Sequence, residues 1–527
     1  MASAGTSTDV IIVGSGHNGL VAAVTLAAAG KRVLVLEGQP YPGGATVSAR
    51  IFPEYDAQIS RYSYLISLFS EQLADDLGLQ LKCQRRKVAS FTPWQNQRGE
   101  QRGLLISNDD HARTRKSLRT LCGTDDAWQS LQRFEELRQE FSRLVWPTML
   151  RPLQSRSTFE KQLVTAPQRA AWEAFVERPL GEYLEQNFAN DLVRGLLMTD
   201  GRIGLSVDAH DPTLLQNRCF IYHVIGNLTG EWRVPTGGMQ ALTSALLQRC
   251  AELGVQIKCG CPVMHLETGL NHHSVTWEES GQQRSCSAEY VLVNAGRRTE
   301  AAILNREWNP EPGDEGSVIK INMLLKRLPE MLTTDAVAAE AFAGTLHLNE
   351  GYEQMRSAWR TAQGGVLPAP PPGELYCHTL TDPSILSPEL QQAGFHTVTL
   401  FGLDMPWRVF ENRHDERREQ VLRHYLDSIS AICQESIEDC LAVNADGSHC
   451  VEVMTPQDLQ RAVGLDYGNI FHNQLSWFFT EREAEAGSWG VETEIPRVLR
   501  AGSSAMRGGA VSGIPGWSAA QSVLGKS

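Results

Sequence analysis

The stretch DVIIVGSGHNGLVAA at residues 9–23, followed by VLVLE at residues 33–37, decides the fold of this chain of 527 residues. The apolar, β-branched run before the first glycine is typical of a buried parallel strand. The glycine turn leads into an apolar segment that can form a helix, and the N–H groups that begin such a helix favour phosphate. A second apolar run then ends on an acidic residue. This order of strand, turn, helix, strand and acid predicts a β–α–β unit that binds a dinucleotide.

The glycines of this turn and the acid after the second strand each meet a separate chemical need. Gly14 permits a tight turn, Gly16 lets the backbone approach a pyrophosphate, and Gly19 lets the helix pack closely on the strand. Glu37 stands at the end of the second strand, where a carboxylate can accept hydrogen bonds from a ribose diol. His17 lies inside the turn, so it must lie near the pyrophosphate or the rest of the cofactor. Acid–base chemistry and simple packing beside the cofactor are both open for it.

Two further glycine-rich segments indicate which dinucleotide is bound. The pair Gly43 and Gly44 follows the ribose acid and resembles the second phosphate-contacting turn of FAD-binding oxidoreductases. Near the C-terminus, RAGSSAMRGGAVSGIPGWSAA at residues 500–520 predicts a strand end, a glycine-rich crossing and a helix that starts at Gly513 and Ile514. Backbone N–H groups at that helix start could face the O2/N1 edge of an isoalloxazine and stabilise reduced, anionic flavin. FAD is therefore the expected cofactor, and because no flavin-linking His or Cys motif is evident, we expect it to be non-covalent.

Three internal segments carry a resemblance to a known family. They are WRVPTGGMQAL at residues 232–242, YVLVNAG at residues 290–296 and YGNIFH at residues 467–472. Together with both glycine-rich ends, they resemble the phytoene desaturase family of flavoproteins, which shares its fold with the amine oxidases. Within that family the chain is similar to the branch of pyridine nucleotide-disulfide oxidoreductase domain-containing proteins. Many relatives carry arginine after the glycine pair, whereas Ala45 follows here and Arg50 lies farther on, so a phosphate contact by Arg50 is open.

The resemblance implies an α/β fold with a Rossmann-type FAD-binding domain and a second, α+β substrate domain. Glycine-rich turns lie at both ends of the chain, so the FAD-binding domain must be discontinuous, with residues 1–85, 231–300 and 456–527. The substrate domain would take residues 86–230, which have helical periodicity, and residues 301–455, which carry strand-like apolar runs. The cofactor contacts expected on this basis are Gly14, Gly16, His17, Asn18, Gly19, Glu37, Gly43, Gly44, Ala45, Val263, Gly296, Gly502, Gly513 and Ile514.

Three residues are candidates for the reaction centre. Lys320 lies in a predicted strand, at a position where amine oxidase relatives often place a lysine near flavin N5; an edge or surface lysine is the alternative. His472 precedes the C-terminal flavin segment, where it either faces the substrate or makes a structural hydrogen bond. Trp517 follows the predicted flavin-facing turn and could line an apolar pocket, although aromatic residues are more often plain core.

Charge and residue spacing argue against several classes of partner. The net charge of −13 disfavours nucleic acid, because phosphate binding requires basic patches. The 11 cysteines form no C-x-x-C motif, which argues against a disulfide redox centre or a zinc site. The adjacent His272 and His273 have no carboxylate or cysteine at ligand spacing, so we expect no metal.

Targeting and membrane signals are not evident in the sequence. The first nine residues are small and polar, and no apolar run approaches the roughly 18 residues of a membrane-spanning helix. We therefore expect a cytoplasmic protein. Peripheral contact with a membrane and formation of a homo-oligomer both stay open, because an amphipathic patch would be enough for the former.

A single G-x-G-x-x-G motif lies between a predicted strand and a predicted helix. Flavoenzymes that take electrons from NAD(P)H usually carry a second such unit, so we expect a small organic substrate to reduce the flavin directly. The resemblance implies that hydride passes from an apolar or partly apolar substrate to flavin N5, which forms a C=C or C=N bond. Electrons would then leave to O2, a quinone or another acceptor. A redox-neutral double-bond isomerase and a non-catalytic flavoprotein scaffold are the alternatives.

Overall fold

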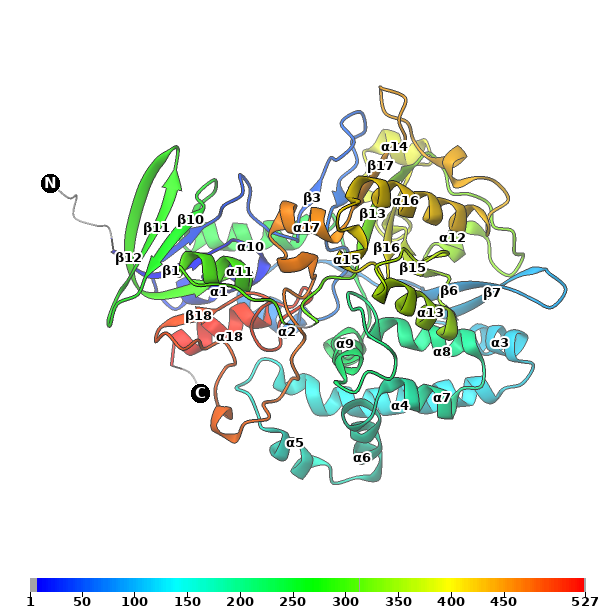
Figure 1. Ribbon diagram of the computed structural model, residues 1–527, viewed down its shortest axis with the longest axis horizontal. Helices are drawn as coiled ribbons and strands as arrows, with labels where there is room; N and C mark the ends of the chain where they lie inside the picture. Colours follow the sequence, from blue (N-terminus) through cyan, green and yellow to red (C-terminus); the bar gives the residue numbers. More distant parts are fainter. Residues whose placement is uncertain (1–6, 312, 526–527) are drawn as a thin grey trace.

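Two seven-stranded sheets organise the chain, and the computed structural model describes residues 7–311 and 313–525 of it (Figure 1). The first sheet has the order β10-β11-β12-β1-β2-β9, and β18 pairs with the end of β12. Its strands are β1 Ser7–Val13, β2 Val33–Leu36, β9 Gln256–Lys258, β10 Val263–Glu267, β11 His273–Glu279, β12 Gln282–Val293 and β18 Val498–Arg500. One sheet thus combines strands from the two ends and the middle of the chain.

The predicted β–α–β unit forms the centre of the first sheet. β1 pairs in parallel with β2 on one side, where Val10 lies opposite Val33, and with β12 on the other. α1 (His17–Ala28) follows the glycine turn and is buried over most of its length. α10 (Gln240–Glu252) and α18 (Ile514–Val523) pack against α1 within the same apolar core. The α/β fold predicted from the sequence is confirmed.

The second sheet is mostly antiparallel and has the order β17-β13-β16-β15-β14-β6-β7. All residues of its strand β13 are buried, and α16 (His414–Ser430) packs against the sheet with Val421, Tyr425 and Ile429. The strands are β6 Val88–Gln95, β7 Gln101–Ser107, β13 Ile319–Leu325, β14 Thr345–Leu348, β15 Gly373–Tyr376, β16 His396–Gly402 and β17 Val451–Met454.

Residues 88–107 depart from the helical structure predicted for residues 86–230. They form the hairpin β6–β7, which extends the second sheet, and helices begin only after it. Charged and polar residues around the hairpin obscure its strand pattern in the sequence, yet Phe91, Leu104 and Leu105 are all buried. Cross-strand packing of such side chains stabilises a sheet even where the surrounding composition is polar. The residue boundaries of the two domains stay a prediction.

A helical layer follows the hairpin and lies below the second sheet in the view of Figure 1. Its core is rich in aromatic side chains, among them Phe134, Phe141, Phe175 and Phe220. The helices of this layer are α3 His111–Cys122, α4 Asp126–Val145, α5 Arg156–Gln162, α6 Ala166–Trp172, α7 Leu180–Asn187, α8 Asp191–Met198 and α9 Leu215–Val224.

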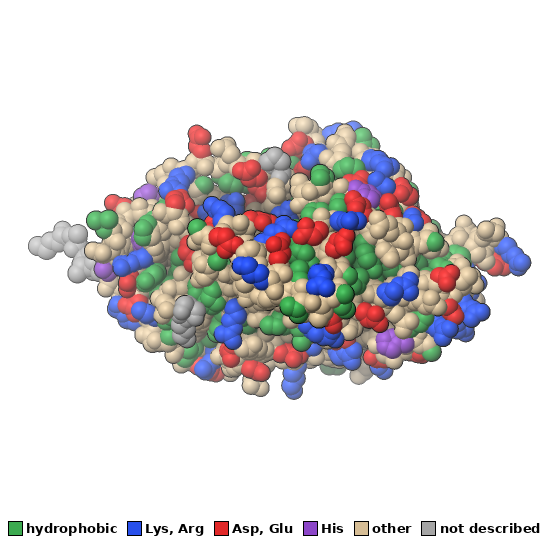
Figure 2. Space-filling view, turned by 90° about the horizontal axis from the view of Figure 1, so that it is seen from below, with side chains coloured by type: hydrophobic (Ala, Val, Ile, Leu, Met, Phe, Trp, Pro, Cys, Tyr) green, Lys and Arg blue, Asp and Glu red, His purple; other side chains and the backbone are tan. Residues whose placement is uncertain are grey.

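Shorter elements connect these layers. The helices among them are α2 Glu71–Leu77, α11 Arg297–Ile303, α12 Ala338–Ala341, α13 Tyr352–Gln363, α14 Pro388–Gln392, α15 Trp407–Phe410 and α17 Pro456–Val463. The short strands are β3 Ser48–Ala49, β4 Ile59–Ser60, β5 Cys83–Gln84 and β8 Val234–Pro235. None of the described helices combines the length and apolarity needed to cross a membrane. On the face seen in Figure 2, acidic and basic side chains are interspersed.

The crossing of α1 and α18 leaves no room for a side chain at Gly516. A Cβ there would lie 1.9 Å from the carbonyl oxygen of Asn18. We expect Gly516→Ala to push the helices apart at an overpacking cost of about 1–3 kcal/mol, which lowers the melting temperature by roughly 1–3 °C in a chain of this size. Circular dichroism melts check this. Gly364→Ala is the matched control, because its Cβ would only touch Thr361 at 3.4 Å; equal melting temperatures would contradict the prediction.

Candidate functional site

A cavity of about 400 Å³ lies where the carboxyl ends of strands in the first sheet meet the second sheet. Val13, Leu36 and Asn294, at or next to the ends of β1, β2 and β12, line it on one side. Lys320 of β13 and Phe401 of β16 line it on the other. Open α/β sheets bind their ligands outside the carboxyl ends of the strands. The cavity therefore has the position of a nucleotide-binding site.

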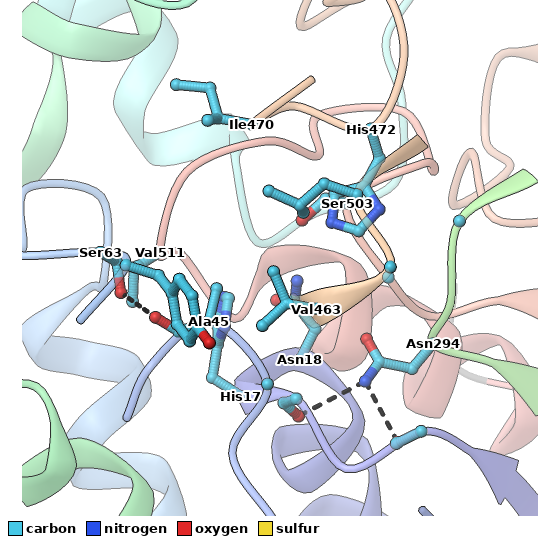
Figure 3. Close-up of a pocket in the computed structure, with 18 of the residues that line it drawn as sticks. His17, Asn18, Ala45, Ser63, Asn294, Val463, Ile470, His472, Ser503 and Val511 are labelled. Carbon is cyan, nitrogen blue, oxygen red and sulfur yellow. Dashed lines mark hydrogen bonds between the residues drawn. The ribbon is translucent and has the colours of Figure 1, made fainter. Parts of the chain in front are cut away.

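The glycine turn after β1 leaves no space for a side chain at Gly14 or Gly19. A Cβ on Gly14 would lie 2.5 Å from the carbonyl oxygen of Asn294, and one on Gly19 would lie 2.5 Å from that of Gly14. Asn294 fixes the turn, because its Nδ2 donates a hydrogen bond of 3.1 Å to the Gly14 carbonyl (Figure 3). Gly16 and Gly44 line the cavity with bare backbone. A pyrophosphate can therefore approach the main chain closely here.

Glu37, at the end of β2, is held firmly at the cavity. Its Oε2 accepts hydrogen bonds from the N–H and the hydroxyl of Ser15, at 2.8 and 2.7 Å, and its Oε1 accepts one from the N–H of Gln39 at 2.8 Å. Carboxylate oxygens have further acceptor capacity, which ribose hydroxyls can use. Val263 also lines the cavity, two residues after Cys261, whose N–H donates to the Glu37 carbonyl at 2.8 Å.

Three buried polar atoms on the cavity lining have no hydrogen-bond partner among the described residues. They are His17 Nε2, Asn18 Oδ1 and His472 Nδ1 (Figure 3). The pKa of both histidines is lowered to about 4, by burial for His472 and by burial together with the proximity of His472 for His17. Both rings are therefore neutral at neutral pH, and each can donate and accept a hydrogen bond. Because unpaired buried polar atoms cost free energy, this arrangement fits a polar ligand such as a flavin dinucleotide.

Most of the residues predicted from the sequence meet at this cavity. Gly19 and Gly43 lie behind the lining and allow its close backbone contacts; the Gly43 N–H donates to the Ser15 carbonyl at 3.1 Å. Arg50 lies outside the lining, where its guanidinium donates to the Pro53 carbonyl at 2.5 Å. The predicted residues that line the cavity are Gly14, Gly16, His17, Asn18, Glu37, Gly44, Ala45, Val263, Gly296, Lys320, His472 and Gly502.

In the C-terminal segment, the residues that line the cavity come slightly earlier in the chain than the predicted Gly513 and Ile514. Ala510 and Val511 line it, whereas Gly513 and Ile514 do not. Gly513 has a φ of +73° and makes the turn into α18, and Ile514 is buried in the apolar core. The turn thus directs the backbone before the helix, and not the first helical residues, toward the cavity.

Trp517 also lies outside the cavity lining and takes the other placement that the sequence left open for it, against the apolar core. Its indole N–H donates to the Leu150 carbonyl at 3.4 Å, and its ring packs at the edge of the first-sheet core. The rotation of α18 about its own axis decides the side to which the Trp517 side chain points. The position of Trp517 just after a glycine turn could not reveal which side of the helix it would occupy.

Aromatic side chains that the sequence analysis did not assign to the cavity form the rest of its wall. Tyr64 lies against Phe401, with ring centroids 5.3 Å apart, and Trp232 stacks on His223 at 5.3 Å. Burial lowers the pKa of His223 to about 4, so this ring is also neutral. These side chains come from segments far apart in the chain, and only tertiary packing joins them. Aliphatic side chains complete the wall: Leu65, Ile203, Leu459, Val463, Leu465 and Ile470.

Lys320 is 1% exposed, which excludes a surface lysine. Its Nζ donates hydrogen bonds to the carbonyls of Ser60 and Tyr62, at 2.7 and 2.5 Å, and lies 5.2 Å from the centroid of the Tyr64 ring. Burial lowers its pKa well below the usual value, which favours the neutral amine. A neutral amine has two N–H groups and one lone pair. In that neutral form the two carbonyls take both N–H groups, and the lone pair can accept a hydrogen bond or a proton.

Comparison with known proteins agrees with this geometry. Residues 9–312 match the family described as FAD dependent oxidoreductase. The chain belongs to this family. Membership implies FAD as the dinucleotide of the cavity. An uncharacterized protein of Mycobacterium tuberculosis is 40% identical to this flavoprotein over 528 residues, which cover 98% of this chain and 97% of the relative.

Two further similarities concern the branch and the fold of this flavoprotein. Pyridine nucleotide-disulfide oxidoreductase domain-containing protein 2 of mouse is 27% identical to this chain over 566 residues. The match covers 98% of this chain and 93% of the mouse protein. The structure of cyclohexylamine oxidase from Brevibacterium oxydans aligns with a TM-score of 0.56 at 15% identity, covering 99% of both chains. The predicted relation to the branch and the predicted amine oxidase fold are confirmed. The narrower resemblance to phytoene desaturases stays a prediction.

The variant Gly16→Val tests the cofactor end of the cavity. Its side chain would enter the space that a pyrophosphate needs, while the protein atom near its Cβ is only the flexible Asn294 Nδ2 at 3.2 Å. We expect a folded protein that purifies without flavin absorbance and binds added FAD at least roughly 100-fold more weakly, about 2.7 kcal/mol. Gly364→Ala, at a position outside the cavity lining where the Cβ would only reach the Thr361 carbonyl oxygen at 3.4 Å, should keep FAD. A fully loaded, yellow Gly16→Val protein would sink this assignment.

Proposed function

We propose that this protein is a FAD-dependent dehydrogenase or oxidase of the desaturase type, which binds its FAD without a covalent bond. It would remove hydride from a C–H bond of an apolar or partly apolar organic substrate and create a C=C or C=N bond. When bound, FAD supplies the hydride acceptor, and O2, a quinone or another acceptor takes the electrons afterwards. One observation carries the proposal: a single cavity joins the glycine turn and Glu37 to an aromatic wall that contains Lys320.

The charge of the lining supports an uncharged substrate. Among the lining residues that the structure describes, Glu37 is the one carboxylate, and it belongs to the nucleotide end. The wall around Lys320 offers aromatic rings, aliphatic side chains and the neutral ring of His223. Apolar walls with few polar groups bind apolar molecules by burial of their surface. A substrate that depends on a salt bridge for binding does not fit this wall.

Lys320 supports the chemical step through its proton-accepting capacity. The backbone carbonyls of Ser60 and Tyr62 fix its Nζ, so the free lone pair has one direction relative to strand β13. It can hold a water molecule or accept a proton from a substrate N–H or C–H group as the bond order rises. The buried, aromatic surroundings exclude bulk water, which strengthens such a contact.

Anaerobic mixing with candidate substrates tests the function. Apolar amines and alkenes with an activated C–H bond should bleach the flavin absorbance at about 450 nm. NADH and NADPH should reduce it poorly, because the chain has one G-x-G-x-x-G unit. Heating should release intact FAD. Rapid, saturable bleaching by either nicotinamide nucleotide would overturn the proposed electron source, and a product of unchanged mass formed without an acceptor would instead identify an isomerase.

The variant Lys320→Met tests the role of the amine. We expect FAD to remain bound and one half-reaction to slow by at least about tenfold, or roughly 1.4 kcal/mol of barrier. In the wild type, that half-reaction should also slow as pH falls through the lowered pKa of Lys320, because protonation removes the lone pair; the variant should lack this acid limb. Stopped-flow measurement of both half-reactions gives the rates. Traces that match wild type across the pH range would remove Lys320 from the mechanism.

A further inference from the structure

A buried cluster of ligand-type side chains lies in the second sheet, outside the lining of the flavin cavity. His347 belongs to β14, Glu350 follows that strand, and Glu374 belongs to the neighbouring β15. All three are at most 3% exposed. His347 Nδ1 lies 2.5 Å from Glu350 Oε2 and 4.0 Å from Glu374 Oε1. Within residues 7–311 and 313–525, this is the group of three whose ligand atoms lie within 4.8 Å of one another.

We propose that His347, Glu350 and Glu374 bind one divalent transition-metal ion. An imidazole nitrogen and two carboxylates form a donor set that suits Zn²⁺, Mn²⁺ or Fe²⁺. The sequence analysis did not find these three residues, because His272 and His273 are the pair that stands out as candidate metal ligands. His273 is engaged elsewhere, with its Nε2 at 3.1 Å from the Pro496 carbonyl.

A second cavity supports the proposal independently. It has a volume of about 670 Å³ and is lined by Glu350 together with residues of β6 and α16. Glu350 is 2% exposed, and its Oε1 has no hydrogen-bond partner among the described residues. Thr92 Oγ1 and His424 Nδ1, on residues that line the same cavity, are unpartnered too. The cavity reaches Glu350, whose Oε1 atom lacks a partner, and it has room for an ion with water ligands.

The groups around Glu374 hold its carboxylate in place, as the hydrogen-bond partners of metal-binding carboxylates do. Thr199 Oγ1 donates to its Oε1 at 2.9 Å, and the hydroxyl of Tyr376 donates to its Oε2. Hydrogen bonds of this kind orient ligating carboxylates. Arg86 is a cation close to the cluster, but its Nη1 donates to Thr345 Oγ1 at 3.2 Å. Asp200 is a further carboxyl group whose charge acts on both Glu350 and Glu374. One guanidinium cannot compensate several ionised carboxylates in a buried site, whereas a divalent ion would.

The ion would support the back of the aromatic wall. The Tyr376 ring lies between the cluster and the flavin cavity and stacks on Trp232, with centroids 6.4 Å apart and planes at 9°. Trp232 itself lines that cavity. The proposed role is therefore structural, and the metal assignment does not depend on the proposed reaction.

Metal analysis of the full-length flavoprotein tests the site. We expect about one Zn, Mn or Fe per chain by mass spectrometry after dialysis against metal-free buffer. After removal of the ion with a chelator, the wild type should titrate away the EPR signal of added Mn²⁺ and regain melting temperature. Glu350→Gln and His347→Gln should weaken Mn²⁺ binding roughly 100-fold. Asp427→Asn, at the rim of the same cavity, is the matched control and should bind like wild type.

Two results would overturn the proposal. The first is a wild type that contains no metal as purified and neither binds Mn²⁺ or Zn²⁺ nor gains melting temperature from them after chelation. The cluster would then be a closed hydrogen-bond network. The second is a folded Glu350→Gln variant with wild-type metal content. The wild-type measurements decide the question even if the variants fail to fold, and none of these readouts requires a substrate.

Discussion

The hydrogen bond from Asn294 to the Gly14 carbonyl is the contact on which the cavity depends. It ties the end of β12 to the turn after β1, and it is possible because neither Gly14 nor Gly19 carries a Cβ. Any side chain at either glycine would collide with backbone or amide atoms at 2.5 to 2.6 Å. The same turn begins α1, against which α10 and α18 pack. Loss of this contact would therefore disturb the cofactor end and its supporting helices together.

The sequence predicted the parts of the molecule that depend on local backbone chemistry. The glycine turn, Glu37 and the strands of the β–α–β unit follow from short-range rules, and Lys320 was located through the resemblance of its strand. Side-chain direction beyond a turn was less predictable, because the phase of α18 takes Trp517 away from the cavity. The aromatic wall could not be predicted, since its members come from distant segments that only tertiary packing joins.

Burial, and not pairing of charges, controls the protonation of the cavity. It lowers the pKa of His17, His223 and His472 to about 4 and that of Lys320 well below its usual value. The three imidazole rings of the lining are thus neutral donors and acceptors near neutral pH, and the Lys320 amine is shifted toward its neutral form. In a dry site such groups interact more strongly than they do in water. A ligand that forms or loses charge there would be more sensitive to each of them.

The pairing of β18 with β12 has a consequence for the order of biosynthesis. The ribosome synthesises the strand Val498–Arg500 and the cavity-lining residues Ala510 and Val511 long after the strands β1 and β12. Until then the first sheet lacks a strand and the cavity lacks part of its wall. The nascent protein must keep an unfinished sheet from aggregating, and its cofactor can be enclosed only after these late residues have been synthesised.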